Sequence, residues 1–399
     1  MISSAETMVT RFQSMNTRLD ELSVQVNDRI SNAVAEVNDF ALQIANLNAG
    51  IRNAEASYGQ PANDLRDQRD QLVLEINKRI KVTTTSNADG TYNLFVGSGQ
   101  QLVVGTSVVE LTAEGSKADP TKIVIGLKVP TGSQELPDSL IVGGELGGLV
   151  AFRNEALEPA ANEIGRAAAS LALTFNAQHA LGQDLLGSIA GASGFVGQFF
   201  NIPDPKIIPN SDPSQNALTI TAKFAAPEAP NAPDFSGNFY TELRNDSYEL
   251  QFSGGAYIVT RLSDHIQLSA SEITSTTVAG TVTATFDGIT LTFDPVAQNV
   301  NKFVIKPVSE LAKDISINAR IAADPRLVAA GAPVAVQPKV SNTGTMVMSQ
   351  GIVGVGYDIS SSATLIANAT ATALTGISGD WTATYSGVPP VSVSGTGGA

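Results

Sequence analysis

The 399-residue sequence contains no cysteine, a single tryptophan and only 6% aromatic residues. Without cysteine, disulfides, thiolate metal sites and cysteine nucleophiles are excluded, so packing alone must hold the protein together even outside the cell. No apolar run approaches the roughly 18 residues that a membrane-spanning helix needs. The first residues, MISSAETMVTRF, lack the basic and apolar regions of a Sec-type signal peptide.

Positive charge is also scarce. The chain has 24 Lys and Arg against 38 Asp and Glu, a net charge of −14 and a sequence pI near 4.6. The electrostatic field of this negative net charge repels nucleic acids and anionic membranes, so we expect neither among the partners of the protein. Hydrophobic residues at 43% and charged residues at 16% indicate a folded chain.

The first part of the chain predicts one long helix over about residues 5–57, of the kind found in coiled-coil rods. Its apolar seam repeats at spacings of mostly three and four: Phe12, Met15, Leu19, Leu22, Val26, Ile30, Ala33, Val37, Phe40, Ile44, Leu47 and Ile51. Gly59 and Pro61 then break the helix. A second helix is predicted over 63–80, with Asn63 as its N-cap and Leu65, Leu72, Ile76 and Ile80 facing the first helix.

A third helix is predicted over 145–180, with Pro159 causing a kink or break near residues 157–158. Its seam is Leu146, Leu149, Phe152, Leu157, Ala160, Ile164, Ala168, Leu171 and Phe175. The Ala-rich turns at 167–172 allow a close neighbour. We expect the second and third helices to cover the seam of the first.

Between the second and third helices, residues 82–141 predict a β-hairpin excursion that turns at Asp89–Gly90 and becomes irregular after residue 100. Prolines 203–213 mark a linker, followed by an exposed loop, APEAPNAPD. Two hairpins follow, YELQFSGGAYIVT and TVTATFDGITLTFDP. They pair Phe252 with Tyr257 and Phe286 with Ile289, and a threonine face points to solvent.

The expected fold class is therefore α+β multidomain, an elongated helical rod with separate antiparallel β domains. The predicted divisions are a helical core domain over 1–182, an antiparallel β domain over 183–331 and a further β-rich outer domain over 332–399, which we expect to be incomplete.

Three groups of residues invite a chemical interpretation. In NDLRDQRDQL, Asp64, Asp67 and Asp70 lie three apart, but Arg66 and Arg69 fall between them and the calcium-loop spacing is absent. Helix-start electrostatics and helix packing explain them better. The glycines at 143, 144, 147 and 148 lack a phosphate-loop pattern and suit close backbone packing.

The two histidines, His179 and His265, lie in different predicted elements, and the chain has no G-x-S-x-G elbow. We therefore predict no catalytic, metal or cofactor-binding residues, no cofactor and no enzyme activity.

Three stretches resemble the hook-associated protein 1 (FlgK-type) family of bacterial flagella. They are NDLRDQRDQLVLEINKRIKVTTTSNADGTYNLFVGSGQQLVVG, GGELGGLVAFRNEALEPAANEIGRAAASLALTFNAQHALGQDLLG, and the β stretch from YELQFSGG through FDGITLTFDP and NKFVIKP to ISINARIAADPRLVAAG. Their order and spacing match the family over about residues 1–331.

The resemblance implies a structural protein of the extracellular flagellum. Such proteins are exported by the type III apparatus and form the junction ring between hook and filament. The implied partners are copies of the same protein, the hook protein and hook-associated protein 3, with an export chaperone bound only through a C-terminal segment. The family's terminal polymerisation segments are missing here, so we expect a fragment that is mainly monomeric in isolation.

Two other interpretations remain open. A bacterial or phage adhesin would combine a helical stalk with glycan-binding β modules, although the chain offers one tryptophan and few tyrosines for a sugar platform. An extracellular hydrolase would need two convergent carboxylates in a cleft, and no motif supports one.

Overall fold

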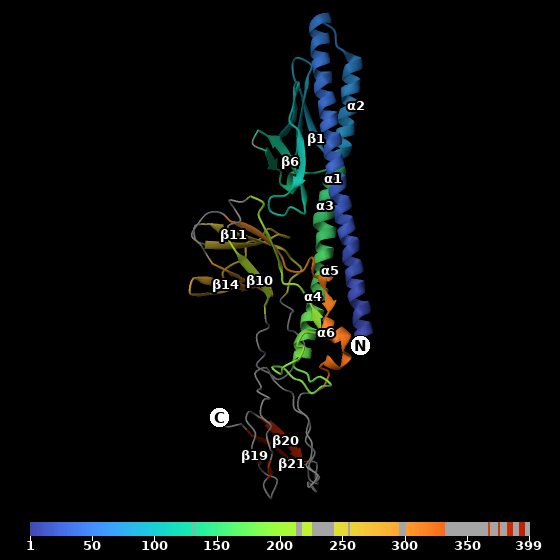
Figure 1. Ribbon diagram of the computed structural model, residues 1–399. Helices are drawn as coiled ribbons and strands as arrows, with labels where there is room; N and C mark the ends of the chain where they lie inside the picture. The colour runs from blue at the N-terminus through green and yellow to red at the C-terminus, as the bar shows by residue number, and fades with distance from the viewer. Residues whose placement is uncertain are drawn as a thin grey trace.

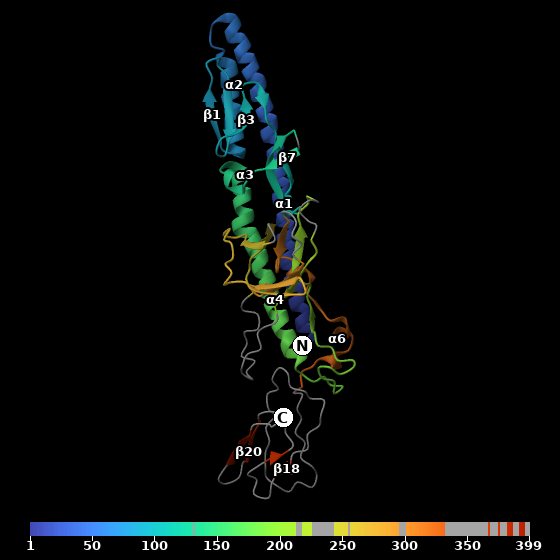
Figure 2. The same cartoon turned by 90° about the vertical axis from the view of Figure 1, so that its left-hand side faces the viewer.

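Helices form a long rod in this protein, and β sheets lie along one side of it (Figures 1 and 2). The computed structural model describes residues 1–130, 132–212, 218–225, 243–253, 256–294 and 301–331, and beyond these only the backbone of four short strands. The rod consists of α1 (Ile2–Tyr58), α2 (Asn63–Arg79), α3 (Gly144–Phe152) and α4 (Glu158–Ala180), with a π-helical turn at Arg153–Leu157. The α+β multidomain class is confirmed.

The long first helix is present as predicted. At 57 residues, α1 is about 85 Å long. It ends where Gly59 adopts a left-handed φ of 66° and donates its N–H to the Glu55 carbonyl. Most of the central seam of α1 is buried, but Met15 and Leu22 remain 50% and 39% exposed. The expectation that α2 and the third helix cover the whole seam is therefore wrong at these positions.

Helix α2 packs against α1 through Ile76, which is fully buried, while Leu65 and Leu72 are only half-buried. Its N-cap is Ala62, and Asn63 is the first helical residue. The prediction that Asn63 caps this helix is wrong.

The predicted third helix is continuous, but its regular α geometry is interrupted by the π-helical turn that ends at Leu157, next to the predicted kink or break near residues 157–158. A proline cannot donate a backbone hydrogen bond, and its ring crowds the preceding turn. The π-helical turn at Arg153–Leu157 comes just before Pro159, with the N–H of Glu158 bonded to the Arg153 carbonyl. This wider turn accommodates the proline without ending the helix.

The excursion between α2 and α3 is more regular than predicted, because it forms two antiparallel sheets. The first contains β1 (Val82–Ser86), β2 (Tyr92–Val96), β3 (Gln100–Val104) and β4 (Ser107–Val108). The second contains β5 (Leu111–Gly115), β6 (Ile123–Val129) and β7 (Gly132–Glu135), followed by a 3-10 turn at Asp138–Leu140.

Two four-stranded sheets make up the part after α4. One has the order β12 (Ala256–Arg261), β11 (Tyr248–Ser253), β16 (Lys302–Lys306), β9 (Lys206–Pro209). The other has the order β10 (Ile220–Phe224), β15 (Ile289–Phe293), β14 (Thr281–Phe286), β13 (Thr274–Val278). Between the sheets, the ring centroids of Tyr248 and Phe286 lie 5.2 Å apart.

Both predicted hairpin registers are confirmed, with Phe252 opposite Tyr257 and Phe286 opposite Ile289. Along β14, half-buried threonines alternate with buried apolar residues, as the predicted solvent face requires. The predicted proline linker instead contains edge strand β9, whose last residue is Pro209, where a missing N–H is tolerated. The glycine loop at 254–255 and the APEAPNAPD segment after Ala225 lie outside the described residues.

Short elements complete the structure. They are β8 (Phe200–Asn201), α5 (Leu311–Asp314), β17 (Ser316–Ile317), α6 (Ala319–Ala323) and a 3-10 turn at Pro325–Leu327. Strand β18 (Ile366–Ala367) pairs with β19 (Leu374–Thr375), and β20 (Trp381–Tyr385) pairs with β21 (Val391–Gly395). No helix in the described ranges is both long and apolar enough to span a bilayer.

Buried apolar side chains gather in two separate core clusters. The upper core combines the middle of α1 from Val26, α2, α3, the π turn and the first two sheets. The lower core combines Val9 of α1, the alanines of α4 and the two sheets after it. The predicted domain boundaries after residues 182 and 331 stay a prediction.

Helix α4 joins the lower core by very close packing and by buried polar anchors. A Cβ on Gly165 would lie 1.8 Å from the Val308 carbonyl oxygen, so only glycine fits there. Asn176 donates to the Phe200 carbonyl at 2.8 Å and accepts the N–H groups of Phe199 and Phe200. These bonds satisfy buried backbone groups where the chain returns to the helix.

His179, one turn beyond Asn176 on α4, is buried and bonded at both ring nitrogens. Its Nδ1 lies 3.1 Å from the Gly197 carbonyl oxygen, and its Nε2 accepts the Ala329 N–H at 2.9 Å. This arrangement requires the neutral ring with its proton on Nδ1. Burial lowers the pKa of His179 below its ordinary value, opposed by the Gly197 bond and by nearby Asp184.

We predict that acidification destabilises the protein through His179. Below about pH 6.5 the unfolded chain protonates this histidine while the folded chain resists, so the free energy of unfolding falls as pH falls. In urea unfolding at a series of pH values, His179→Gln should flatten this dependence. The exposed His265 provides the matched control, and an equal flattening by His265→Gln would contradict the assignment.

Candidate functional site

The charged stretch that begins α2 separates its two signs onto different faces. Asp64, Asp67 and Asp70 are exposed, whereas Arg66 and Arg69 turn toward α1. Arg69 Nε lies 3.9 Å from the Asp70 carboxylate, beyond hydrogen-bond distance. Arg69 and Asp70 still form a loose ion pair, but the hydrogen bonds of Arg66 and Arg69 go to other partners.

Arg66 fastens α2 to the end of α1. Its Nε and Nη2 donate to the two carboxylate oxygens of Glu55 at 2.8 and 2.9 Å. Glu55 also accepts the N–H of Ala62 at 3.0 Å. The Arg66 and Ala62 bonds hold the pKa of Glu55 below its ordinary value. One carboxylate thus ties the end of α1 to the turn and to the start of α2.

Arg69 is almost wholly buried, with 1% of its surface exposed. Its guanidinium carbon lies 3.3 Å from the centroid of the Tyr92 ring, and its Nη1 donates to the Gly90 carbonyl at 2.7 Å and to Asn48 at 3.2 Å. Burial lowers the pKa of this guanidinium, while Tyr92 and Asp70 counteract the shift.

Asn48 completes this arrangement from α1. Its amide donates to the Tyr92 carbonyl at 2.8 Å and to the Gly105 carbonyl at 2.6 Å, and its carbonyl oxygen accepts the Tyr92 N–H at 3.0 Å. We call Asn48, Arg69, Gly90 and Tyr92 the arginine cluster. Sequence reasoning missed it, although an asparagine beside the apolar seam of α1 was a usable signal.

The glycines near α3 serve close packing, as predicted. Gly144 has φ 61°, and a Cβ there would lie 2.6 Å from the Arg79 carbonyl carbon. At Gly147 the corresponding distance to the Val142 carbonyl carbon is 2.9 Å. Gly148, in contrast, faces open space. The approach at Gly144 lets α3 start directly beside the end of α2, and the approach at Gly147 packs α3 against the segment that precedes it.

The structure does not bring the histidines into a ligand set. Both nitrogens of His179 already have backbone partners, and His265 is exposed after β12. Among the described residues, no group of three or more His, Cys, Asp or Glu could hold a metal ion.

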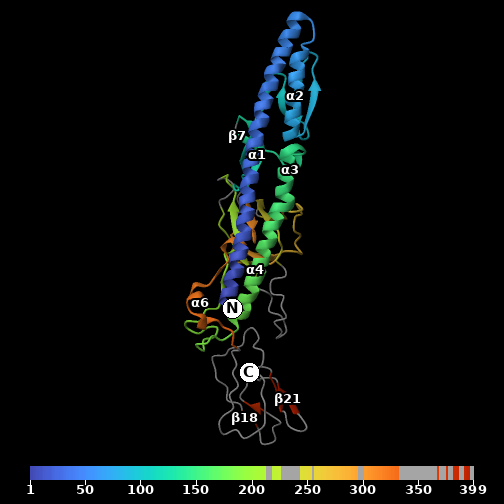
Figure 3. The same cartoon turned by 90° about the vertical axis from the view of Figure 1, so that its right-hand side faces the viewer.

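Four large apolar side chains of the predicted helix seams remain exposed on α1, α3 and α4, the helices that face the viewer in Figure 3. We call Met15, Leu22, Phe152 and Leu171 the open seam; their exposures are 50%, 39%, 43% and 37%. Leu22 and Phe152 line the same groove. Exposed large apolar side chains that gather beside a groove suit a contact surface.

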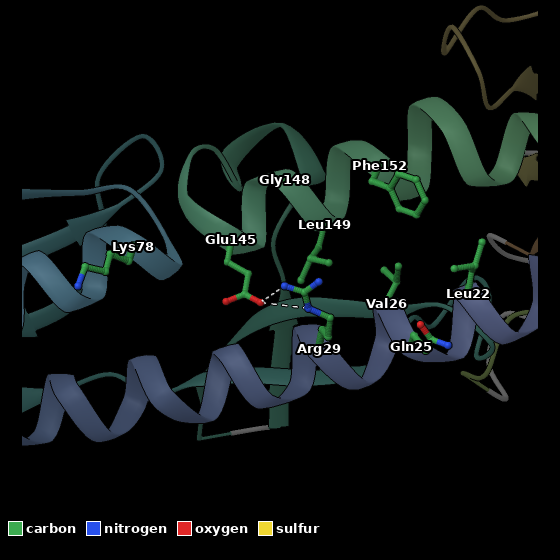
Figure 4. A pocket seen from close by; sticks show the side chains of 9 residues that line it. All are labelled: Leu22, Gln25, Val26, Arg29, Lys78, Glu145, Gly148, Leu149 and Phe152. Carbon is green, nitrogen blue, oxygen red and sulfur yellow. Dashed lines mark hydrogen bonds and ion pairs between the residues drawn. The ribbon is translucent and has the colours of Figure 1, made fainter.

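The open seam borders a groove of about 600 Å³ between α1 and α3. In Figure 4, Leu22 and Val26 of α1 face Leu149 and Phe152 across it. At one end, Glu145 accepts from Arg29 at 2.6 Å and from Arg79 at 3.0 Å. Arg79 also pairs with Glu36. The groove therefore has an apolar floor and a charged end whose acid already has partners.

We predict that Arg69→Gln destabilises the protein by about 2–4 kcal/mol, because it removes the cation–π contact and leaves buried acceptors unpaired. Asp67→Asn should cost no more than about 1 kcal/mol, since Asp67 is exposed. Urea unfolding of both variants measures the contrast. A larger loss for Asp67→Asn would contradict the structural role assigned to the arginines.

Comparison with known proteins places these features in a family. A family model described as the helical domain of the flagellar hook-associated protein FlgK matches residues 1–195. A second, described as the D2-like domain of flagellar hook-associated protein 1, matches residues 209–307.

Relatives and a solved structure agree with these matches. Flagellar hook-associated protein 1 of Salmonella typhimurium is 34% identical over 320 residues, which are 79% of this chain and 53% of that protein. The Escherichia coli K12 protein is 31% identical over 320 residues, 79% of this chain and 54% of that protein. The flagellar hook junction protein FlgK from Burkholderia pseudomallei matches with a TM-score of 0.78 and 28% identity, over 99% of this chain and 68% of that chain.

The chain thus spans about half the length of the curated relatives it matches. Helical and β parts match in the same order, and together the two family models cover well over half of the sequence. The resemblance inferred from the sequence is confirmed, and the chain belongs to the flagellar hook-associated protein 1 (FlgK) family.

Proposed function

We propose that this chain forms the helical core and outer β part of a structural subunit in the junction between flagellar hook and filament, outside the cell. The observation that carries the proposal is the match of both parts, in order, to FlgK, with a TM-score of 0.78 to a hook junction protein. The comparisons give the adhesin hypothesis no support.

Subunit packing, rather than catalysis, would perform this function. The partners would be copies of the same protein, the hook protein on one side and hook-associated protein 3 on the other. An export chaperone would bind through a C-terminal segment. The open seam supports the proposal, because a helical rod with uncovered apolar residues is suited to packing against further helices.

A chimera tests the proposal. Residues 1–331 would replace the matching part of hook-associated protein 1 in a bacterium that lacks its own copy, with the host's terminal segments retained. We expect filaments on the hooks and restored swimming, and the same chimera with Asp67→Asn should behave alike. A chimera that is exported and folded yet leaves hooks without filaments would contradict the proposal.

We also predict that the isolated 399-residue chain is mainly monomeric at low salt, because its net charge of −14 opposes association. Light scattering over a range of concentrations measures this. A stable oligomer that does not dissociate on dilution would contradict the prediction. If Leu22→Asp then dissociated this oligomer into monomers, while the exposed-surface change Asp67→Asn did not, the contact between subunits would lie at the open seam.

A further inference from the structure

Between its two cores the rod has a section in which neither helix buries a side chain. In α1, residues 17–25 are all described and none of their side chains is buried. On the facing helix, residues 158–164 are likewise described and none is buried. We call residues 17–25 and 158–164 the waist; the π turn at 153–157 borders it.

No buried apolar side chain of either core lies in the waist, although half-buried Leu19 packs against the upper core and half-buried Ile164 against the lower core. In α1, the lower core includes Val9 and the upper core begins at Val26. On the facing helix, the upper core ends at Leu157 and the lower core begins at Ala168. A bend here would therefore separate few buried apolar contacts, and elements with few such contacts are the ones that move easily.

The local backbone geometry also favours a bend at the waist. The π turn and Pro159 weaken the regular hydrogen-bond ladder of the helix that crosses the waist. The open groove beside Leu22 and Phe152 leaves room on the side away from the sheets.

On the side of the sheets, one loop bridges the cores. It connects β5 and β6 of the upper core, and its Asp119 lies 2.5 Å from Lys306 Nζ on β16 of the lower core. The side chains are only 10% and 21% exposed. In the same loop, the Lys117 carbonyl accepts the Ser211 N–H at 2.8 Å.

The loop is firmly held within the upper core. Thr121 donates its backbone N–H and its hydroxyl to Asp119 at 3.1 and 2.6 Å, and Lys122 reaches Glu158 at the start of α4 at 3.1 Å. The Asp119 carboxylate is therefore held in place by the upper core. The Lys306 ammonium, on β16, is the group of the lower core that binds it.

We propose that the rod bends at the waist and that the Asp119–Lys306 ion pair acts as a clasp that limits the bend. The upper and lower cores would each move as a rigid body, in the manner of a hinge whose motion is confined to a few residues. The inference rests on the packing of this chain and is independent of the proposed function.

Paired spin labels test it, because the natural sequence has no cysteine to interfere. In the 399-residue chain, Asp67→Cys with Ala167→Cys spans the waist. Asp67→Cys with Thr84→Cys stays in the upper part, and Ala167→Cys with Lys223→Cys stays in the lower part. All four positions are exposed. Pulsed electron resonance gives the distance distribution of each pair.

We expect the spanning pair to show a distribution roughly twofold wider than either control, and Lys306→Gln to widen it further without changing the controls. Asp119→Asn provides a second clasp variant, and thermal melting checks that both fold. A spanning distribution as narrow as the controls would overturn the hinge. A wide distribution that neither clasp variant alters would overturn the role of the ion pair.

Discussion

A helix as long as α1 is stable only where other parts of the chain cover its apolar side, since isolated helices gain little from propensity alone. The other described helices of the rod pack against the apolar side of α1. Helix α2 and the first sheets cover its middle, and α4 with the short helix α5 lies along its beginning. The apolar side chains that they leave exposed on α1, α3 and α4 are those of the open seam.

Buried polar side chains hold these packed elements in place. Arg69 and Asn48 bond the turn of the first hairpin to the rod, and Asn176 and His179 bond the lower β part to α4. Each joins side chains to buried backbone groups that would otherwise lack partners, and leaving such groups unpaired is costly. The polar anchors therefore fix geometry, while apolar packing supplies most of the stability.

Two cores on one long helix give the rod an uneven stiffness. Within each core, sheets and helices share buried side chains, whereas no buried apolar side chain lies in the waist and the 116–122 loop with its Asp119 joins the two cores through polar contacts. The π turn borders this section, where the sequence predicted a kink or break near residues 157–158.

Elements whose pattern is local could be predicted from the amino-acid sequence. The seam of α1, the breakers Gly59 and Pro61, and the Asp287–Gly288 hairpin each follow from spacing or turn chemistry within a few residues, and the structure has them. In contrast, the direction in which Arg69 points, the continuity of the helix at Pro159 and the place of the open seam became visible only in the folded chain. Those outcomes depend on contacts between residues far apart in the chain, such as Arg69 with Gly90, and a period of three or four cannot show which partner will cover a given face.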